Sequence, residues 1–278
     1  MKFLRNTFFF TQTPSSAPTD TPAAPLAGGA DGASAGWQLS SVGLRRGATQ
    51  VFDALDLRLD EPRIGLIGRN GAGKTSLLRM LSGLETPHAG RIAWRGQTLH
   101  GDGRSHAPGR HVGLMFQNPD DQIIFPTVQE ELALSWQSAH GGDRHGAREG
   151  VAQFLHQRGM ADWGPRAVAA LSQGQRQWVC WLALLLAGPS VLLLDEPYAS
   201  LDLPGQLRMA HDIAASGQQI IVSTHVLDHV RGLDRVLWLD CGRVRADGPG
   251  AQICADYEAW VRSGHQPRAD AGQRPLET

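Results

Sequence analysis

The sequence has few cysteines, no long apolar run and almost no net charge. Its three cysteines, Cys180, Cys241 and Cys254, form no C-x-x-C pair, which excludes a cysteine zinc site and a disulfide scaffold and fits a reducing compartment. The formal net charge of −1 gives no electrostatic basis for nonspecific nucleic-acid binding, so we expect no nucleic-acid partner. The longest apolar run, 178–188, is too short for a membrane-spanning helix and ends at a Gly-Pro pair.

Large apolar side chains are also scarce at 11–36 and at 265–278. Residues 11–36 are mostly Pro, Ala, Ser, Thr and Gly, which cannot bury enough surface to offset the entropy cost of ordering. We therefore expect a disordered low-complexity N-terminus at 1–36 and a disordered tail at 265–278. The folded domain is predicted at 37–264.

Short apolar runs alternate with longer helical stretches within this domain. The strand candidates are 63–68, 112–116, 190–195 and 219–224, and the helix candidates are 74–84 and 175–187. Such alternation predicts an α/β fold with a mainly parallel sheet. The stretch 235–244 has the pattern of a strand, a turn and a return strand, and 118–170 has helical patterns that indicate an insertion.

The first motif, GRNGAGKT at 68–75, matches the phosphate-binding loop G-x-x-x-x-G-K-[ST] between a predicted strand and a predicted helix. Its glycines allow backbone N–H groups to surround a phosphate chain. Lys74 can reach the β- and γ-phosphates, and the Thr75 hydroxyl can bind Mg²⁺. The predicted nucleotide-binding residues here are Gly68, Arg69, Asn70, Gly71, Ala72, Gly73, Lys74, Thr75 and Ser76.

The second motif, SVLLLDEP at 190–197, ends a buried strand in two carboxylates. Asp195 comes at the carboxyl end of the strand, where α/β sheets bind ligands, and can hold Mg²⁺. Glu196 can orient and deprotonate an attacking water, so the pair predicts hydrolysis of a nucleotide rather than transfer to a large acceptor.

The third motif, LSQGQ at 171–175, begins a predicted helix with Ser172 as the N-cap, which is a second potential anion site. This pentapeptide resembles LSGGQ, the signature of ABC ATPases, with Gln173 where glycine is usual. From about Trp37 to Ser263 the chain is similar to that family. The resemblance implies a P-loop NTPase with a RecA-like core, an antiparallel β subdomain and an α-helical subdomain at about 118–187.

The family resemblance also implies how the two anion sites are used. In that family two subunits pair head to tail, and each ATP lies between the phosphate loop of one and the signature of the other. Since both half-sites are intact here, we expect a homodimer that binds ATP and Mg²⁺. Ser172, Gln173, Gly174 and Gln175 would then contact the partner's nucleotide.

Smaller elements extend the resemblance. Gln117 matches the start of the Q-loop, where it would touch Mg²⁺ or water, Asp202 in SLD matches the D-loop, and His225 matches the switch histidine at the γ-phosphate. Lys74, Gln117, Glu196 and His225 are thus the predicted catalytic residues, and Thr75, Gln117 and Asp195 the predicted Mg²⁺ ligands. Arg46 stands where the family usually has an aromatic residue that stacks on adenine, and its guanidinium can stack in the same way.

The stretch QNPDDQIIFPTVQEELAL at 117–134 resembles the ATPases of energy-coupling factor transporters. In that group it forms a groove for a coupling helix of a transmembrane scaffold (T-type) protein, which works with a small substrate-binding (S-type) membrane protein. A groove of this kind would combine an apolar patch with an acidic rim. The expected patch is Ile123, Ile124, Phe125, Val128 and Leu132, and the expected rim is Asp120, Asp121, Glu130 and Glu131.

A helix that packs its apolar face into its own domain is the alternative interpretation of this stretch. The resemblance implies a peripheral protein on the cytoplasmic side of the cell membrane that powers uptake of a vitamin, most similar to biotin transporters. Cobalt or nickel uptake, a conventional ABC importer and a nonenzymatic ATP-gated dimer remain alternatives.

Overall fold

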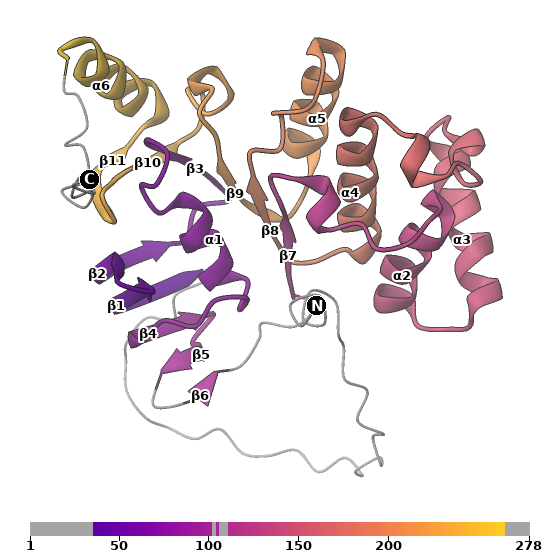
Figure 1. The fold of residues 1–278 in the computed structure, drawn as a ribbon, viewed down its shortest axis with the longest axis horizontal. Helices are drawn as coiled ribbons and strands as arrows, with labels where there is room; N and C mark the ends of the chain where they lie inside the picture. Colours follow the sequence, from indigo (N-terminus) through magenta and orange to yellow (C-terminus); the bar gives the residue numbers. More distant parts are fainter. Residues whose placement is uncertain (1–35, 102–103, 106–110, 265–278) are drawn as a thin grey trace, which may run out of the picture.

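The computed structural model describes residues 36–101, 104–105 and 111–264. The predicted disordered segments at 1–36 and 265–278 lie outside these residues except for Gly36, whose backbone N–H donates to Oδ1 of Asp60 at 3.0 Å. Figure 1 shows a central sheet, a second sheet beside it, and a group of helices on the opposite side. No helix among the described residues is long and apolar enough to cross a membrane.

The central sheet has six strands in the order β11-β10-β3-β9-β8-β7. The strands from β7 to β10 pair in parallel, and β11 closes one edge antiparallel to β10. This confirms the predicted parallel α/β fold. The strands are β3 (Arg63–Ile67), β7 (Val112–Met115), β8 (Val191–Asp195), β9 (Gln219–Ser223), β10 (Arg235–Asp240) and β11 (Arg243–Gly248).

Helices cover both faces of this sheet, which explains the continuous apolar strand patterns. All five residues of β8 are buried, and their side chains alternate between two cores. Val191 and Leu193 pack in the core of α1 (Lys74–Leu81) and the second sheet. Leu192 and Leu194 pack in the core of α4 (Gln173–Ala187), α5 (Leu203–Ala215) and α6 (Gly250–Arg262).

The second sheet is antiparallel and has the order β2-β1-β4-β5-β6. Its β1–β2 hairpin turns immediately after Arg46, which pairs with Thr49 across the two strands. This turn lies near the start of α1 and helps to form the functional site. The strands are β1 (Trp37–Arg46), β2 (Thr49–Leu59), β4 (Ala89–Trp94), β5 (Gln97–Gly101) and β6 (Arg104–Ser105).

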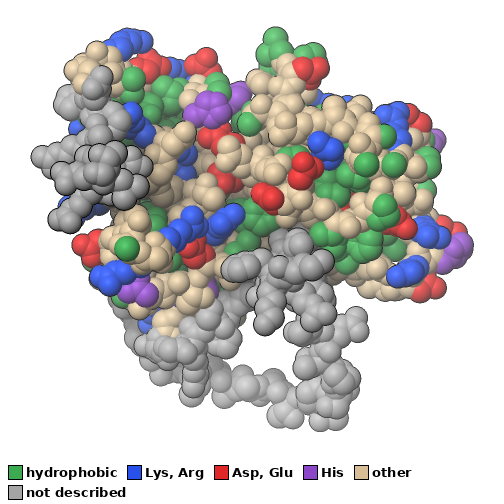
Figure 2. Space-filling model, in the orientation of Figure 1, with side chains coloured by type: hydrophobic (Ala, Val, Ile, Leu, Met, Phe, Trp, Pro, Cys, Tyr) green, Lys and Arg blue, Asp and Glu red, His purple; other side chains and the backbone are tan. Residues whose placement is uncertain are grey.

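The predicted helical insertion lies between β7 and β8 in the chain. It contains α2 (Val128–His140), α3 (Arg144–Gln157) and α4, with three short 3-10 turns at Pro119–Asp121, Ala161–Trp163 and Val168–Ala170; another follows β9 at Leu227–His229. Figure 1 shows α4 between α5 and the pair α2 and α3. Because one side of α4 packs on α2 and the other on the core sheet, α4 joins the insertion to the rest of the domain. Basic and acidic side chains are interspersed on the face in Figure 2, in keeping with the net charge of −1.

Candidate functional site

The phosphate loop connects the end of β3 to the start of α1, as predicted. The backbone φ is +141° at Gly68 and +107° at Gly73, a region that side chains rarely adopt. A Cβ at Gly68 would also lie 2.1 Å from the carbonyl oxygen of Leu239. Lys74 is 8% exposed, and its Nζ donates to the carbonyl oxygens of Gly68 at 2.7 Å and Arg69 at 3.1 Å. The lysine is therefore held across the loop that would surround a phosphate chain.

Asp195 joins the phosphate loop to the central sheet. The Thr75 hydroxyl donates to Oδ2 of Asp195 at 2.7 Å, and the Ser223 hydroxyl donates to Oδ1. Asp195 is 4% exposed at the end of β8. A hydroxyl and a carboxylate side by side are oxygen donors that suit Mg²⁺, so Thr75 and Asp195 fit the predicted metal site.

Glu196 and His225 are also brought together. Oε2 of Glu196 lies 2.8 Å from Nδ1 of His225 and accepts the His225 backbone N–H at 3.3 Å. Glu196 itself has φ +50° and is anchored because its backbone N–H donates to the Ser223 carbonyl at 3.0 Å. The Glu196 carboxylate is therefore held by His225, and Glu196 lines the same cavity as the phosphate loop. Burial lowers the pKa of Lys74, while the nearby charges of Glu196 and Asp195 act in the opposite direction.

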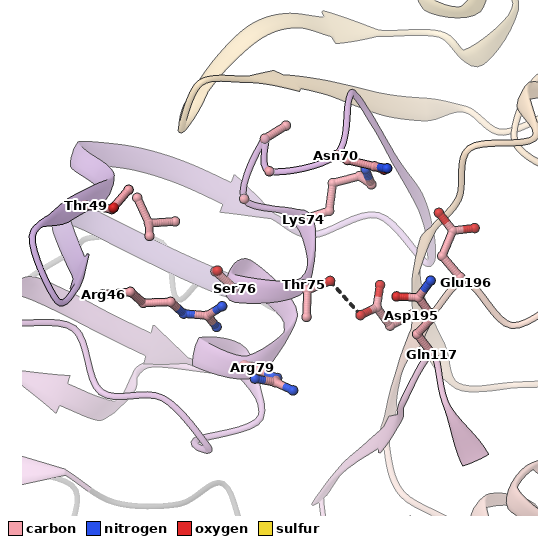
Figure 3. A pocket seen from close by; sticks show the side chains of 14 residues that line it. Arg46, Thr49, Asn70, Lys74, Thr75, Ser76, Arg79, Gln117, Asp195 and Glu196 are labelled. Atoms are coloured by element: carbon pink, nitrogen blue, oxygen red, sulfur yellow. Dashed lines mark hydrogen bonds between the residues drawn. The ribbon is translucent and has the colours of Figure 1, made fainter. Parts of the chain in front are cut away.

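Lys74, Thr75, Asp195 and Glu196 line one cavity of about 650 Å³, whereas the predicted site residues Gly68 and His225 do not line it. In Figure 3, Arg46 and Ser76 lie on one side of the cavity, Gln117, Asp195 and Glu196 lie on the other, and Lys74 and Thr75 lie between them. The cavity has the volume of a small-molecule pocket, and the phosphate loop beside it carries the positive charge of Lys74. Both features suit a nucleoside triphosphate.

Three lining residues were missed from the sequence: Thr49, Val51 and Arg79. Thr49 could have been found from the hairpin, since it pairs directly with Arg46. Arg79 follows Thr75 by four residues, so it lies on the same face of α1.

Arg69 was predicted among the nucleotide-binding residues but does not line the cavity. Its guanidinium carbon lies 6.0 Å from the ring centre of Trp260 on α6. Its neighbours Asn70, Gly71, Ala72 and Gly73 do line the cavity. The side chain of Arg69 therefore faces the last helix, because the loop turns there.

Arg46 lines the outer part of the cavity and forms an ion pair. Its Nε and Nη2 donate to the two carboxylate oxygens of Glu85 at 2.7 and 2.6 Å. Hydrogen bonding to Glu85 raises the pKa of Arg46 against the opposing effect of burial. The guanidinium plane is thus fixed at the position where an adenine ring is expected.

The predicted signature begins α4 in another part of the chain. Ser172 and Gln175 form a reciprocal N-terminal cap: the Ser172 hydroxyl accepts from Gln175 N at 3.2 Å, and Gln175 Oε1 accepts from Ser172 N at 2.9 Å. Neither these residues nor Gln173 and Gly174 line the nucleotide cavity. Asp202 caps α5 by accepting from Gly205 N at 3.0 Å. Within one chain, the structure does not bring the signature and the phosphate loop together.

The predicted groove at 117–134 needs correction. Val128 and Leu132 are fully buried, because they lie four residues apart on the face of α2 that packs against α4. Glu131 is 4% exposed, and its Oε2 accepts the backbone N–H groups of Ile124 at 3.0 Å and Phe125 at 2.9 Å. These three residues therefore belong to neither an exposed patch nor a rim.

Part of the predicted groove does remain on the surface. Ile124 is 53% exposed, Asp121 is exposed, and Asp120 forms an ion pair with Arg176 of α4 at 3.1 Å. Burial raises the pKa of Glu131 although the hydrogen bonds from Phe125 and Ile124 lower it. Glu131 is best understood as a structural residue that closes the loop before α2.

Nucleotide hydrolysis is the chemistry that this cavity suits, and the surrounding fold is that of a P-loop ATPase. The chain belongs to the ABC transporter family, whose pattern matches residues 53–199. As a member, it is an ATPase that uses ATP and Mg²⁺. Thr75 and Asp195 fit the metal, and Lys74 and the loop around it fit the phosphates.

Two curated relatives and a solved structure illustrate the similarity. The chain is 45% identical over 225 residues to the biotin transport ATP-binding protein BioM of Rhodobacter capsulatus. The matched region covers 81% of this chain and 95% of that relative. It is 34% identical over 205 residues to the energy-coupling factor transporter ATP-binding protein EcfA1 of Lactiplantibacillus plantarum, covering 72% of each. The solved structure of cbiO1 from Clostridium perfringens, part of the ABC transporter complex cbiONQ, shares the fold with a TM-score of 0.65 at 23% identity, covering 81% and 93% of the two chains.

Proposed function

We propose that this protein is the ATP-hydrolysing subunit of an energy-coupling factor importer for biotin. The observation that carries the proposal is the 45% identity to BioM over 95% of that relative. The identity to EcfA1 supports the transporter class, and the stretch 117–134 resembles the same class. Biotin itself would bind a membrane partner, so the cargo rests on the similarity to BioM.

The active unit is a head-to-tail homodimer in this proposal. The signature at the start of α4 does not line the nucleotide cavity of its own chain, so it is available to a second copy. A Cβ at Gly174 would lie 2.6 Å from the carbonyl oxygen of Ser200, so glycine permits close packing of the signature on the segment before Asp202. This packed unit would then complete the nucleotide site of the partner, and its residues are Ser172, Gln173, Gly174, Gln175 and Asp202.

Each residue around the phosphate loop has a role in this hydrolysis. The Lys74 ammonium and the loop N–H groups bind the phosphates, and Thr75, Asp195 and Gln117 hold the metal or its water. Bound Mg²⁺ supplies positive charge that stabilises the developing charge on phosphate oxygens. Glu196 orients the attacking water and takes its proton, and His225 holds the Glu196 carboxylate in place.

Membrane coupling would use the outward side of α2 and the loop before it. A cavity of about 120 Å³ is lined there by Phe125, Glu130, Ala133 and Leu134, with Arg144 and Arg148 of α3. Together with exposed Asp121 and Ile124, this surface suits an amphipathic coupling helix of a T-type scaffold that also carries an S-type protein. We place the protein on the cytoplasmic side of the membrane through these partners.

A mild-detergent pull-down of the tagged protein from its native membranes, followed by mass spectrometry, tests the proposal. We expect a scaffold protein and a small, very hydrophobic protein that binds biotin. A small protein that binds cobalt or nickel instead would overturn the cargo, and a conventional permease would overturn the transporter class. Glu196→Gln should leave this complex intact, so it serves as the control for assembly.

A further inference from the structure

A second cavity, of about 260 Å³, lies where the helical insertion meets the core. Its walls come from the end of α3, from α4 and from α5, and α4 lies between the other two helices in Figure 1. The nucleotide cavity is lined by none of these helices. The second cavity is therefore separate from the nucleotide site, and the two share no lining residue.

The floor of this cavity is apolar. Trp178, Leu182 and Leu185 are four and three residues apart, so they share one face of α4. Leu182 is 2% exposed, and Met160 beside it is 6% exposed. This floor can accept the apolar body of a small molecule.

Two arginines, Arg158 and Arg208, also line this cavity. The guanidinium carbon of Arg158 lies 3.8 Å from the ring centre of Phe154, and that of Arg208 lies 5.2 Å from the ring centre of Trp178. Within the described part of the chain, neither arginine has a carboxylate oxygen within 4.0 Å. A guanidinium over a ring keeps its N–H donors at its edge, so both groups can still bind an anion.

The charge balance of the cavity is positive. Asp212 is the carboxylate among the described lining residues, and its Oδ2 already accepts from the indole Nε1 of Trp181 at 3.1 Å. Burial lowers the pKa of Arg158, the charge of Asp212 raises it, and the charge of Arg208 lowers it to a smaller extent than Asp212 raises it. Asp212 therefore offsets one of the two positive charges, and the other remains available to attract an anion into the cavity.

We propose that this cavity binds a small organic anion, with its carboxylate between Arg158 and Arg208 and its apolar body on Trp178 and Leu182. The volume falls below the roughly 300 Å³ at which pockets for drug-sized ligands begin, so the ligand is small. Arg158 follows α3 in the insertion, whereas Arg208 belongs to α5 of the core. A ligand held by both opposes movement of the insertion against the core.

Octanoate is a suitable probe, because it combines a carboxylate with a short apolar chain. Calorimetric titration would use the full chain with its nucleotide site saturated by ADP and Mg²⁺. We expect octanoate to bind more tightly than octanol or inorganic phosphate. Arg158→Gln and Arg208→Gln should each weaken octanoate binding about tenfold.

Arg243→Gln on β11 is the matched control, because it removes an exposed arginine that lines neither this cavity nor the nucleotide cavity, and it should leave octanoate binding unchanged. Since Arg208 is exposed, its substitution should preserve the circular dichroism spectrum. Equal octanoate affinity in the wild type and the Arg158→Gln/Arg208→Gln double variant would overturn the proposal. If octanol bound as tightly as octanoate, the role of the arginines would be overturned. If inorganic phosphate bound as tightly as octanoate and required the two arginines, the role of the apolar floor would be overturned.

Discussion

Arg46 and Glu85 form a two-point ion pair at the outer part of the nucleotide cavity. The pair joins the end of β1 to the segment after α1, with both nitrogen–oxygen distances below 2.8 Å. A flexible arginine would lose side-chain entropy when it stacks on a base, whereas one already fixed loses less. Glu85 can therefore act as a positioning residue for the base, through Arg46.

The first prediction concerns this pair. Arg46→Ala and Glu85→Gln should each weaken ATP binding several-fold. The first substitution removes the guanidinium plane, and the second removes the ion pair that fixes it. In a double-mutant cycle, Glu85→Gln should have little further effect once Arg46 is alanine. Calorimetric titration with ATP provides the affinities.

Inorganic triphosphate is the control ligand, because it has no base. Its affinity should be the same in the wild type and in both variants. Unchanged ATP affinity in Arg46→Ala would show that another group holds the adenine.

The second prediction concerns Glu196. Glu196→Gln should lower ATP turnover by about a hundredfold or more, because an amide cannot accept the proton of water. The variant should accumulate as an ATP-bound dimer in size-exclusion chromatography. Glu149→Gln, which changes an exposed carboxylate on α3, should hydrolyse ATP at the normal rate. A wild-type rate in Glu196→Gln would mean that a different group acts as the base.

The third prediction concerns Gly174. Gly174→Ala would place a Cβ 2.6 Å from a backbone oxygen, which cannot move as easily as a side chain. We expect it to shift the signature, so that ATP-driven dimerisation and turnover are lost while the monomer binds ATP normally. Gly217→Ala is the matched control, since nothing lies within 4 Å of that Cβ. Normal dimerisation of Gly174→Ala would count against the proposed interface.

The fourth prediction separates Glu131 from Asp121. Glu131→Lys should destabilise the fold by about 2–4 kcal/mol, because it buries an unpaired charge and removes two hydrogen bonds to the backbone. Asp121→Lys changes an exposed side chain, so its thermal midpoint should stay the same while the membrane partner is lost. Thermal unfolding and the pull-down measure the two effects. Retained assembly in Asp121→Lys would argue against this docking surface.

The fifth prediction follows from the raised pKa of Glu131. The pKa of Glu131 is raised above its ordinary value of 4.5, so just above pH 4.5 the Glu131 carboxyl keeps its proton in the folded state and has lost it in the unfolded state. The contribution of Glu131 to the free energy of unfolding is therefore fully present below pH 4.5. It declines as the pH rises from 4.5 through the raised pKa of the folded state. Denaturant unfolding at several pH values should show this decline in the wild type, and Glu131→Gln should remove it. The same pH dependence in both proteins would assign it to other groups.

The local sequence determined much of the fold and of the catalytic edge. The phosphate loop and the two carboxylates at 195–196 follow buried strands, and parallel strands bring their carboxyl ends to one edge. The two motifs, combined with this rule, therefore predict that Lys74, Thr75, Asp195 and Glu196 meet at one site, and all four line one cavity. These features depend on residues that are close in the chain or on a general rule of sheet topology.

Only the tertiary structure decided which side chains of the helices face inward. The apolar and acidic residues of 123–132 suit both a groove and a packed helix, and contact with α4 buries Val128, Leu132 and Glu131. Glu85, the partner of Arg46, likewise comes from a distant part of the chain, and so does Arg208, which lines the same cavity as Arg158. Sequence periodicity determines that a helix has an apolar face, but packing against a neighbour determines which polar groups are buried with it, because burial depends on contacts that no local pattern contains.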